Sequence, residues 1–416
     1  MEIPKQDRRI LRDLAKQFAE FAADPVNRER RELWTRLNDL HSVRPMVWAF
    51  EIPWNEMDVG GELTLQCTHP LARSTEDRFR KRLYQWRHMP GDMVLEPDFE
   101  VVPVVRDTGF GIWEDVDVAR TDQTSSVVSR HFHIQIASEA DIEKIKFPRI
   151  TLDSEAWNRR LDFFRELFDG ILPVKKQGMK WTSIAPWDYL VRLTGVEEVL
   201  LDLVERPRYV HRLMDHLTRA YLARLDQWEA LDILGTNNDL YLGGGYQYTR
   251  ELPRPDAPPG RVRTIDMWGR TMSQIFSSVS PAMHEEFALR YECRWLNRFG
   301  LTYYGCCEPL DRKMEILRRN VPNLRKVSMS PWVDLDLAAR NVGTDYVFSW
   351  KPNPAVFTDE NWSPENARQT LRHGLERLRG LHVEIIMKDI STVAYHPERL
   401  WEWTRIAVEE AQRSAG

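Results

Sequence analysis

The sequence is poor in cysteine and has no long apolar run. Only four cysteines, Cys67, Cys293, Cys306 and Cys307, occur among 416 residues, which is not the disulfide framework of a secreted protein. No stretch approaches the roughly 20 apolar residues that a membrane helix needs. The opening stretch MEIPKQDRRILRDLAKQFAEF is charged and amphipathic, unlike a secretory signal. These absences favour a reduced, cytoplasmic protein that does not enter a membrane.

A strong excess of charge of one sign is also missing. The chain has 58 basic and 63 acidic residues, so its net charge is only −5. Such a balance does not indicate a basic surface for nucleic acid. The length and the 42% hydrophobic content are sufficient for a large core, in one large domain or two smaller ones.

Short apolar runs alternate with amphipathic helical patterns from residue 45 onward. The runs predicted as strands are 45–52, 99–105, 179–185, 232–239, 301–306, 324–330, 345–350 and 383–390. The helical patterns lie at 154–169, 196–230, 281–299, 310–320, 333–341, 364–379 and 397–413. This alternation predicts an α/β fold with parallel strands, and eight such units predict a (β/α)8 TIM barrel over residues 45–416. An open, doubly wound sheet has the same alternation and remains an alternative.

Three segments fall outside the simple repeat. Residues 1–44 read as two helices, the second beginning near Pro25, and predict an N-terminal helical extension. The alternating stretch VVSRHFHIQIAS predicts a β-hairpin within an insertion at 106–140. Residues 240–270 are rich in Gly and Pro and predict a long functional loop, such as a lid or docking surface.

The barrel prediction indicates where a site lies, because such barrels place their active sites at the carboxyl ends of the strands. The residues expected there to bind substrate are Glu51, Trp54, Trp187, Asn237, Trp332 and Lys351. Lys388 and Asp389 follow the last strand, either as catalytic groups or as an ion pair that closes the barrel.

Cys306, Cys307 and Glu308 directly follow the fifth predicted strand. Cysteine thiolate is a soft ligand that suits Zn²⁺, and catalytic zinc keeps one position open for substrate. Glu308 supplies an oxygen ligand or orients a ligand as a base, and Asp389 serves as a fourth group or proton carrier. The alternative is that one of the cysteines is an ordinary core residue.

Several stretches, in order along the chain, resemble one known family. They are DIEKIKFP (141–148), APWDYLVRLTGVEEVLLDLVERPRYVHRLMDHL (185–217), SSVSPAMHEEFALRYECRWLNRFG (277–300), YYGCCEPL (303–310) and VEIIMKDISTVAYHPERLWEWTR (383–405). They resemble the uroporphyrinogen decarboxylase superfamily, and more closely its corrinoid-dependent methyltransferase branch. The resemblance implies a (β/α)8 barrel, in agreement with the spacing, and barrels of this type often form homodimers.

The resemblance also implies a zinc site. Cys306 occupies the position of the family's first cysteine ligand, Tyr304 stands where the family has histidine, and no cysteine follows Cys307. A zinc site here would therefore be rebuilt from Cys306, Cys307, Glu308 and a group such as Asp389.

The implied activity is methyl transfer from a small-molecule methyl donor to the cobalamin or other corrinoid of a separate corrinoid protein. Trp54, Trp187 and Trp332 would then form an apolar wall for a methoxylated aromatic substrate, as in an O-demethylase. A metal-free decarboxylase or lyase that binds carboxylates with Arg44 and Lys351 is the alternative, and a catalytically silent binding protein is a third possibility.

Overall fold

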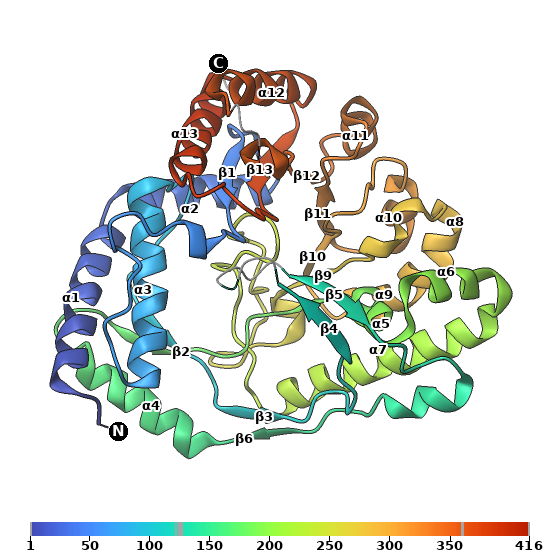
Figure 1. Cartoon of the computed structure of the whole chain (residues 1–416), viewed down its shortest axis with the longest axis horizontal. Helices are drawn as coiled ribbons and strands as arrows, with labels where there is room; N and C mark the ends of the chain where they lie inside the picture. The colour runs from blue at the N-terminus through green and yellow to red at the C-terminus, as the bar shows by residue number, and fades with distance from the viewer. Residues whose placement is uncertain (1, 121–122, 124–127, 359–361, 415–416) are drawn as a thin grey trace.

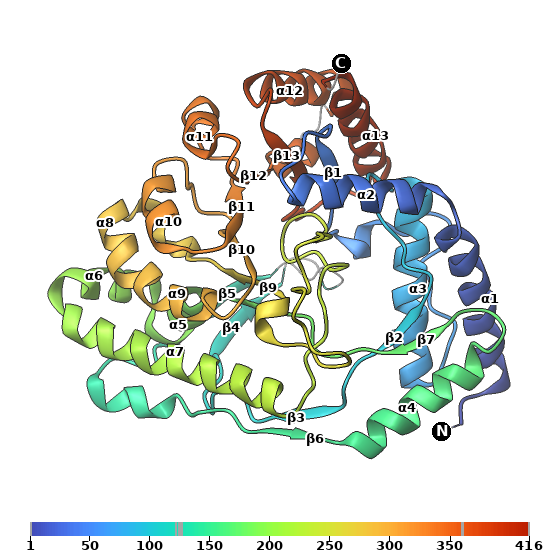
Figure 2. The ribbon, with the colours of Figure 1, turned by 180° about the vertical axis from the view of Figure 1, so that it is seen from behind.

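Seven parallel strands form the central sheet of the computed structural model, which describes residues 2–120, 123, 128–358 and 362–414. In order across the sheet they are β1 (Met46–Ala49), β13 (His382–Met387), β12 (Val347–Trp350), β11 (Leu324–Met329), β10 (Leu301–Tyr304), β9 (Trp268–Thr271) and β8 (Ser183–Ile184). Because neighbouring parallel strands need crossover connections, the helices between them cover the outside of the sheet. Figures 1 and 2 show the helices arranged around it.

The helices follow the predicted order, with two additions. They are α1 (Lys5–Ala22), α2 (Val26–Asn38), α3 (Pro70–His88), α4 (Ser154–Leu167), α5 (Pro186–Thr194), α6 (Val196–Glu205), α7 (Pro207–Ala230), α8 (Pro281–His284), α9 (Arg290–Leu296), α10 (Met314–Asn320), α11 (Leu335–Val342), α12 (Pro364–Arg377) and α13 (Glu398–Arg413). The pattern at 196–230 is divided into α6 and α7 because Pro207 begins a new helix. The two additions are α3 and α5, which lie outside the predicted helical ranges.

The fold is TIM-like, but hydrogen-bonded closure of a barrel is not seen among the described residues. β2 (Phe99–Val101) pairs with β7 (Val174–Lys176) in a separate two-stranded sheet. The predicted strand at 232–239 makes one isolated bridge, from Leu234 to Met179. Beyond it, the Asn237 side chain accepts from the Trp268 N–H at 3.0 Å and donates to the Trp268 carbonyl at 3.0 Å. A side chain therefore replaces backbone pairing beside β9.

β9 lies in the segment predicted to be a loop. Its sequence, WGRT, has a single large apolar residue, so it lacks the pattern of a strand. A Cβ added at Gly269 would lie 2.2 Å from the Phe299 ring, so the glycine allows a helix-side aromatic to pack against the strand. β9 was not predicted, and the strand predicted at 232–239 forms only one bridge. The strands of the sheet therefore differ from the predicted set.

The chain around Gly243–Gly245 packs within the ring of strands rather than forming the expected lid, and it lies at the centre of Figures 1 and 2. A Cβ at Gly243 would lie 2.0 Å from Arg270, and one at Gly244 would lie 2.6 Å from Glu384. The Gly245 N–H donates to Glu384 Oε1 at 3.1 Å, and the other Glu384 oxygen pairs with Lys326 at 2.6 Å. Only glycine permits so close an approach of backbone to buried charge.

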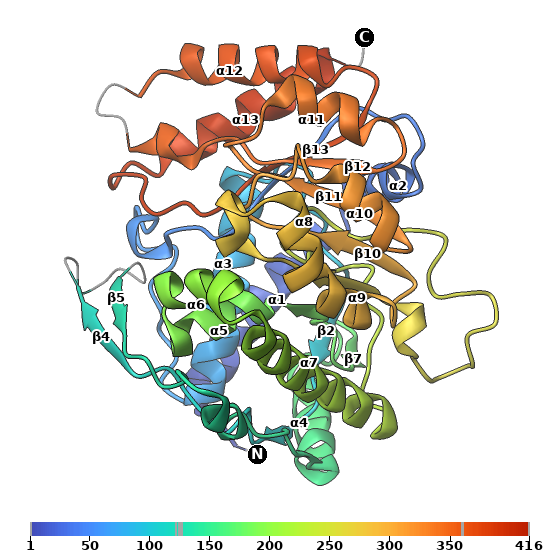
Figure 3. The same cartoon turned by 90° about the vertical axis from the view of Figure 1, so that its right-hand side faces the viewer.

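A hairpin forms within the predicted insertion, but only its second strand comes from the stretch VVSRHFHIQIAS. β4 (Val116–Ala119) pairs antiparallel with β5 (Ser129–Phe132), and the two project from the body in Figure 3. β3 (Val105–Asp107) and β6 (Ile150–Leu152) pair at the base of this insertion. Residues 121–122 and 124–127 of the insertion lie outside the described residues.

The N-terminal helices form, as predicted, and pack against the rest of the chain. Phe18 of α1 contacts the Phe79 ring of α3, and the Trp34 indole of α2 donates to the Asp92 carbonyl at 2.8 Å. The boundary between 1–44 and 45–416 remains a prediction. Within the described ranges, no helix is long and apolar enough to cross a membrane.

Candidate functional site

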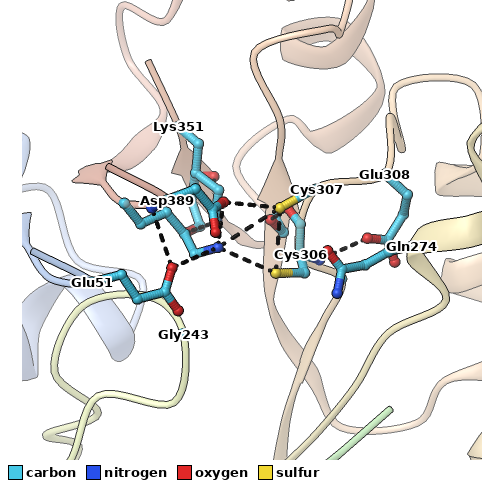
Figure 4. A network of polar contacts seen from close by, with 12 residues as sticks. Glu51, Gly243, Gln274, Cys306, Cys307, Glu308, Lys351 and Asp389 are labelled. Atoms are coloured by element: carbon cyan, nitrogen blue, oxygen red, sulfur yellow. Dashed lines mark hydrogen bonds and ion pairs between the residues drawn. The ribbon is translucent and has the colours of Figure 1, made fainter. Parts of the chain in front are cut away.

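The segments that follow β1, β10 and β13 bring together most of the predicted polar residues. Glu51 follows β1, Cys306 and Cys307 follow β10, and Lys388 and Asp389 follow β13. Because these strands run parallel in one sheet, their carboxyl ends meet at one edge. Figure 4 shows the two sulfurs and the carboxylates of Glu51 and Asp389 converging from opposite sides. We call these five residues the strand-end cluster.

Lys388 is at the centre of the strand-end cluster. Its Nζ lies 3.4 Å from Cys306 Sγ and 3.7 Å from Cys307 Sγ. It also lies 2.6 Å from Asp389 Oδ2 and 3.2 Å from Glu51 Oε2. Burial alone lowers the pKa of this lysine, but the surrounding thiolate and carboxylates outweigh burial and hold the pKa well above its ordinary value. Lys388 is therefore a buried ammonium among anionic partners.

The two thiols are unequal. Their sulfurs are 3.6 Å apart, and Cys307 Sγ lies 3.0 Å from Asp389 Oδ2. The hydrogen bond from Cys307 lowers the pKa of Cys306, and the cations of Arg270 and Lys388 lower it further against the effect of burial. The same hydrogen bond raises the pKa of Cys307. Cys306 is therefore the thiolate, and Cys307 is the thiol that retains a proton.

Asp389 stays ionised in the cluster. Burial acts to raise its pKa, but Lys388 and the hydrogen bonds that it receives hold the pKa of Asp389 at about 2. Burial raises the pKa of Glu51, although its side chain is exposed to the same extent as that of Asp389. The cluster thus combines the ionised carboxylate of Asp389 with the carboxyl group of Glu51, which protonates more readily.

The backbone is strained where these residues meet. Glu51 has φ +53° and Asp389 has φ +55°, a left-handed conformation that is uncommon for residues other than glycine. The Asp389 N–H donates to Glu51 Oε2 at 3.2 Å, which ties the two strained positions together. Strain of this kind persists where the surroundings over-determine it, and it concentrates at functional sites.

Glu308 points away from the thiols. Its Oε2 accepts from the Cys306 N–H at 2.9 Å, and its Oε1 accepts from the Ser273 N–H at 3.0 Å. The side chain is fully buried, and burial raises its pKa. Glu308 therefore fixes the turn that presents Cys306, as a positioning residue rather than a group at the reaction centre.

The predicted zinc site does not fit this arrangement. Lys388 already places a positive charge within hydrogen-bonding distance of both sulfurs, and both oxygens of Glu308 accept backbone N–H groups. In the part of the chain that the structure describes, no group of three or more His, Cys, Asp or Glu side chains is arranged to hold a metal ion. The donor set is that of a lysine-centred ionic cluster.

Two predicted substrate-binding residues belong to the core instead. Trp187 is fully buried, donates to the Phe287 carbonyl at 3.1 Å and packs against Phe276. Asn237 is also fully buried and bridges to Trp268 as described above. Both side chains are engaged by the protein itself, and their role in substrate binding remains a prediction.

Apart from Glu51, which lies in the strand-end cluster, the three remaining predicted substrate-binding residues differ in exposure. Trp54 is half-buried against Tyr84, with ring centroids 6.0 Å apart. Trp332, after β11, is 71% exposed. Lys351, after β12, is buried and donates to Tyr303 Oη at 2.9 Å and Ser349 Oγ at 3.1 Å. Its charge also lowers the pKa of Cys306.

Arg270 is a site residue that sequence reasoning missed. It is buried, and its Nη2 donates to the Gly305 carbonyl at 2.8 Å, directly before Cys306. It was missed because it lies on β9, in the segment read as a loop.

A buried polar chain behind Cys306 was also missed. Tyr304 Oη donates to Glu292 Oε2 at 2.7 Å and lies 2.6 Å from His284 Nε2, while Lys313 Nζ lies 3.0 Å from His284 Nδ1. Ser273 Oγ donates to the other Glu292 oxygen at 2.7 Å, which connects this chain to the Ser273–Glu308 contact. Glu292 interrupts an apolar helical face, between Leu289 and Trp295. A charged residue at such a position is the feature of the sequence that could have predicted this buried polar chain.

Comparison with known proteins supports the fold. No protein-family model and no curated protein matches the chain. A solved structure of a methyltransferase from Methanosarcina mazei is similar over 91% of this chain and 97% of that chain, with a TM-score of 0.50 and 11% identical residues. At that identity the likeness concerns the fold, and membership of the uroporphyrinogen decarboxylase superfamily remains a prediction.

Proposed function

We propose that this protein is a methyltransferase that moves a methyl group from a small methoxylated aromatic compound to the corrinoid of a partner protein. The observation that carries the proposal is the Lys388 ammonium, held among a thiolate and two carboxylates at the strand ends. The sequence resemblance and the fold that the chain shares with the Methanosarcina mazei methyltransferase support the same activity.

Lys388 supplies the acid that ether cleavage requires. When the bond between methyl carbon and oxygen breaks, the leaving oxygen gains negative charge, and Lys388 Nζ donates a proton to that oxygen. The anionic neighbours raise the pKa of Lys388 and keep it protonated before the reaction, so its positive charge also stabilises the leaving oxygen, and a positioned acid typically contributes about 10²–10⁴-fold to the rate. Asp389 and Glu51 hold the ammonium in place. The corrinoid, when its carrier is bound, supplies the nucleophile that accepts the methyl group.

Exposed apolar residues around the strand ends suit a partner protein. Val59, Trp332 and Tyr395 follow β1, β11 and β13 and are 56%, 71% and 61% exposed. The segments after β1 and β13 project on the same side as the β4–β5 hairpin in Figure 3. We call these three residues the apolar rim. We infer that a partner protein covers these exposed side chains, because apolar surface near a site is where docking is expected.

The decarboxylase alternative is less well supported. Arg44 makes two hydrogen bonds to Asp92, at 2.5 and 2.9 Å, and it precedes β1, at the end of the strand opposite the cluster. Lys351 is buried and bound to Tyr303 and Ser349. Both proposed carboxylate-binding cations are therefore engaged by the protein itself.

The test is methyl transfer to cob(I)alamin or a corrinoid protein across a panel of methoxylated aromatic compounds, followed by the cobalamin absorbance. We expect turnover with at least one aromatic methyl ether and release of the demethylated phenol. Decarboxylation of an aromatic acid without methyl transfer would instead support the alternative. Absence of both activities across the panel would contradict the proposal.

A further inference from the structure

The two thiols of the strand-end cluster form a distinct reactive pair. We propose that Cys306 and Cys307 are a peroxide-reactive dithiol, in which a hydroperoxide oxidises Cys306 and Cys307 then closes a disulfide with it. This inference does not rest on the proposed methyl transfer, because it concerns only the chemistry of the two sulfurs.

The geometry favours a reaction between these sulfurs. They lie 3.6 Å apart, although adjacent side chains of an extended strand point in opposite directions. The chain turns directly before them at Gly305, where φ is +95°, and a Cβ there would lie 2.5 Å from Leu310. The turn directs both thiols towards Lys388 and holds the sulfurs in contact, and closing the bond between them then strains the backbone, because adjacent Cα atoms are only about 3.8 Å apart across a trans peptide.

The neighbouring charges divide the roles between the sulfurs. Lys388 Nζ is closer to Cys306 Sγ, at 3.4 Å, and stabilises the thiolate that attacks a peroxide. Asp389 Oδ2, 3.0 Å from Cys307 Sγ, is placed to accept the proton of the second thiol. Cys307 is also the more exposed of the two, with a half-buried side chain.

The reaction balances with a hydroperoxide as the oxidant. The Cys306 thiolate attacks one peroxide oxygen, the O–O bond breaks, and a sulfenic acid forms while the other oxygen leaves as hydroxide or alkoxide. Cys307 loses its proton and attacks Cys306 Sγ, which breaks the S–O bond, forms the disulfide and releases hydroxide that takes up the proton as water. The two sulfurs lose two electrons, and the peroxide gains them.

A disulfide between adjacent cysteines is strained, and strained disulfides are the easily reduced, regulatory ones. Oxidation would remove the thiolate charge beside Lys388 and break the Cys307–Asp389 hydrogen bond. The oxidised form should therefore have an altered strand-end cluster and should recover with a dithiol reductant.

The chain contains its own control cysteines. Cys67 is 1% exposed, and Cys293 is half-buried on α9. Burial raises the pKa of both thiols to about 12, so both are unreactive at neutral pH. Their oxidation rates give the background rate for buried thiols, with which the oxidation rates of Cys306 and Cys307 are compared.

The experiment treats the full-length protein with hydrogen peroxide and measures free thiols and intact mass over time. We expect two of the four thiols to disappear with loss of two hydrogen atoms, peptide mapping to join 306 to 307, and Cys306 to react at least about tenfold faster than Cys293. In Cys307→Ser, a 1,3-diketone probe should trap the sulfenic acid on Cys306. Cys293→Ser, the matched control, should behave as the native protein does.

Three results would overturn the inference. They are oxidation of Cys306 no faster than that of Cys293, sulfenic acid that persists in the native protein while Cys307 stays free, and no diketone adduct on Cys306 in Cys307→Ser. A native protein that forms the disulfide but transfers no methyl group would count against the proposed function alone.

Discussion

In the proposed mechanism, Lys388 is the residue on which the chemistry of the site most depends. Lys388→Met removes the proton donor, so we expect kcat for demethylation to fall by about 10²–10⁴-fold, with a smaller change in KM. Lys388→Arg, the matched control, retains the charge beside Cys306 but donates a proton poorly, so it should restore the reactivity of the thiolate without restoring turnover. Demethylation at the native rate in Lys388→Met would show that the acid is another group.

The sequence was sufficient to place residues but not to orient them. Glu51, Cys306, Cys307, Lys388 and Asp389 were predicted together because each follows a strand, and they do converge. Trp187 and Glu308 also follow strands, yet their side chains turn into the core. The direction of the Trp187 side chain depends on a contact with Phe287, and that of Glu308 on a contact with Ser273. Both partners are distant in sequence, so no local sequence pattern predicts these contacts.

At the scale of single elements, α9 holds a carboxyl group whose titration affects stability. Burial raises the pKa of Glu292 to about 7, from an ordinary value of 4.5. Between these values the folded state binds more protons than the unfolded state, so the stability present below pH 4.5 declines as pH rises through 7. One such group contributes a slope of up to about 1.4 kcal/mol per pH unit.

Glu292→Gln should therefore flatten the pH dependence of the free energy of unfolding between about pH 5 and 7. Urea denaturation at several pH values measures this slope. Glu315→Gln, at a side chain 90% exposed on α10, is the control and should leave the slope unchanged. An equal slope in Glu292→Gln and the native protein would show that Glu292 does not carry this titration.

The segment inside the ring of strands offers a second test at this scale. Gly243 has φ +76° and Gly260 has φ +77°, so alanine is strained to a similar extent at both. Only at Gly243 does a Cβ meet a neighbour, the buried Arg270 at 2.0 Å, whereas nothing lies within 4 Å at Gly260. We expect Gly243→Ala to destabilise the protein by about 1–3 kcal/mol more than Gly260→Ala in urea denaturation. Equal losses would mean that this segment is not tightly packed.

Prediction failed for elements whose pairing involves side chains. β9 was hidden because Gly269 and Arg270 occupy positions that usually carry apolar residues in a buried strand. The fourth predicted strand was reduced to one bridge because the Asn237 amide makes the hydrogen bonds that a backbone would make. The helices were easier, because a helical face is a local pattern of the sequence.

For the molecule as a whole, we propose that the partner protein binds at the apolar rim. In a double variant, Trp332→Ser with Tyr395→Ser, we expect KM for the corrinoid protein to rise by about tenfold or more, because truncating exposed aromatic anchors at an interface commonly costs more than 1 kcal/mol each. Transfer to free cob(I)alamin should change little. Val204→Ser, at a position 73% exposed on α6, is the control. An equal loss of methyl-transfer activity with the corrinoid protein and with free cob(I)alamin would instead place these residues in the catalytic site.

The overall architecture was largely predictable, because parallel strands and crossover helices follow from alternation along the chain. The predicted closure of the barrel is not seen among the described residues, and the contacts of Asn237 and of the interior chain at Gly243–Gly245, which are long-range, were not predictable. The resemblance to a family with zinc did not predict the place of Lys388, whose positive charge lies beside both sulfurs.

Metal content of the active protein tests this lysine-centred site most directly. We expect purified protein that performs methyl transfer to contain far less than one zinc per chain and to keep its activity after treatment with a chelator. One zinc per chain, lost together with activity in Cys306→Ser and restored by added zinc in the native protein, would contradict the assignment of the positive charge to Lys388.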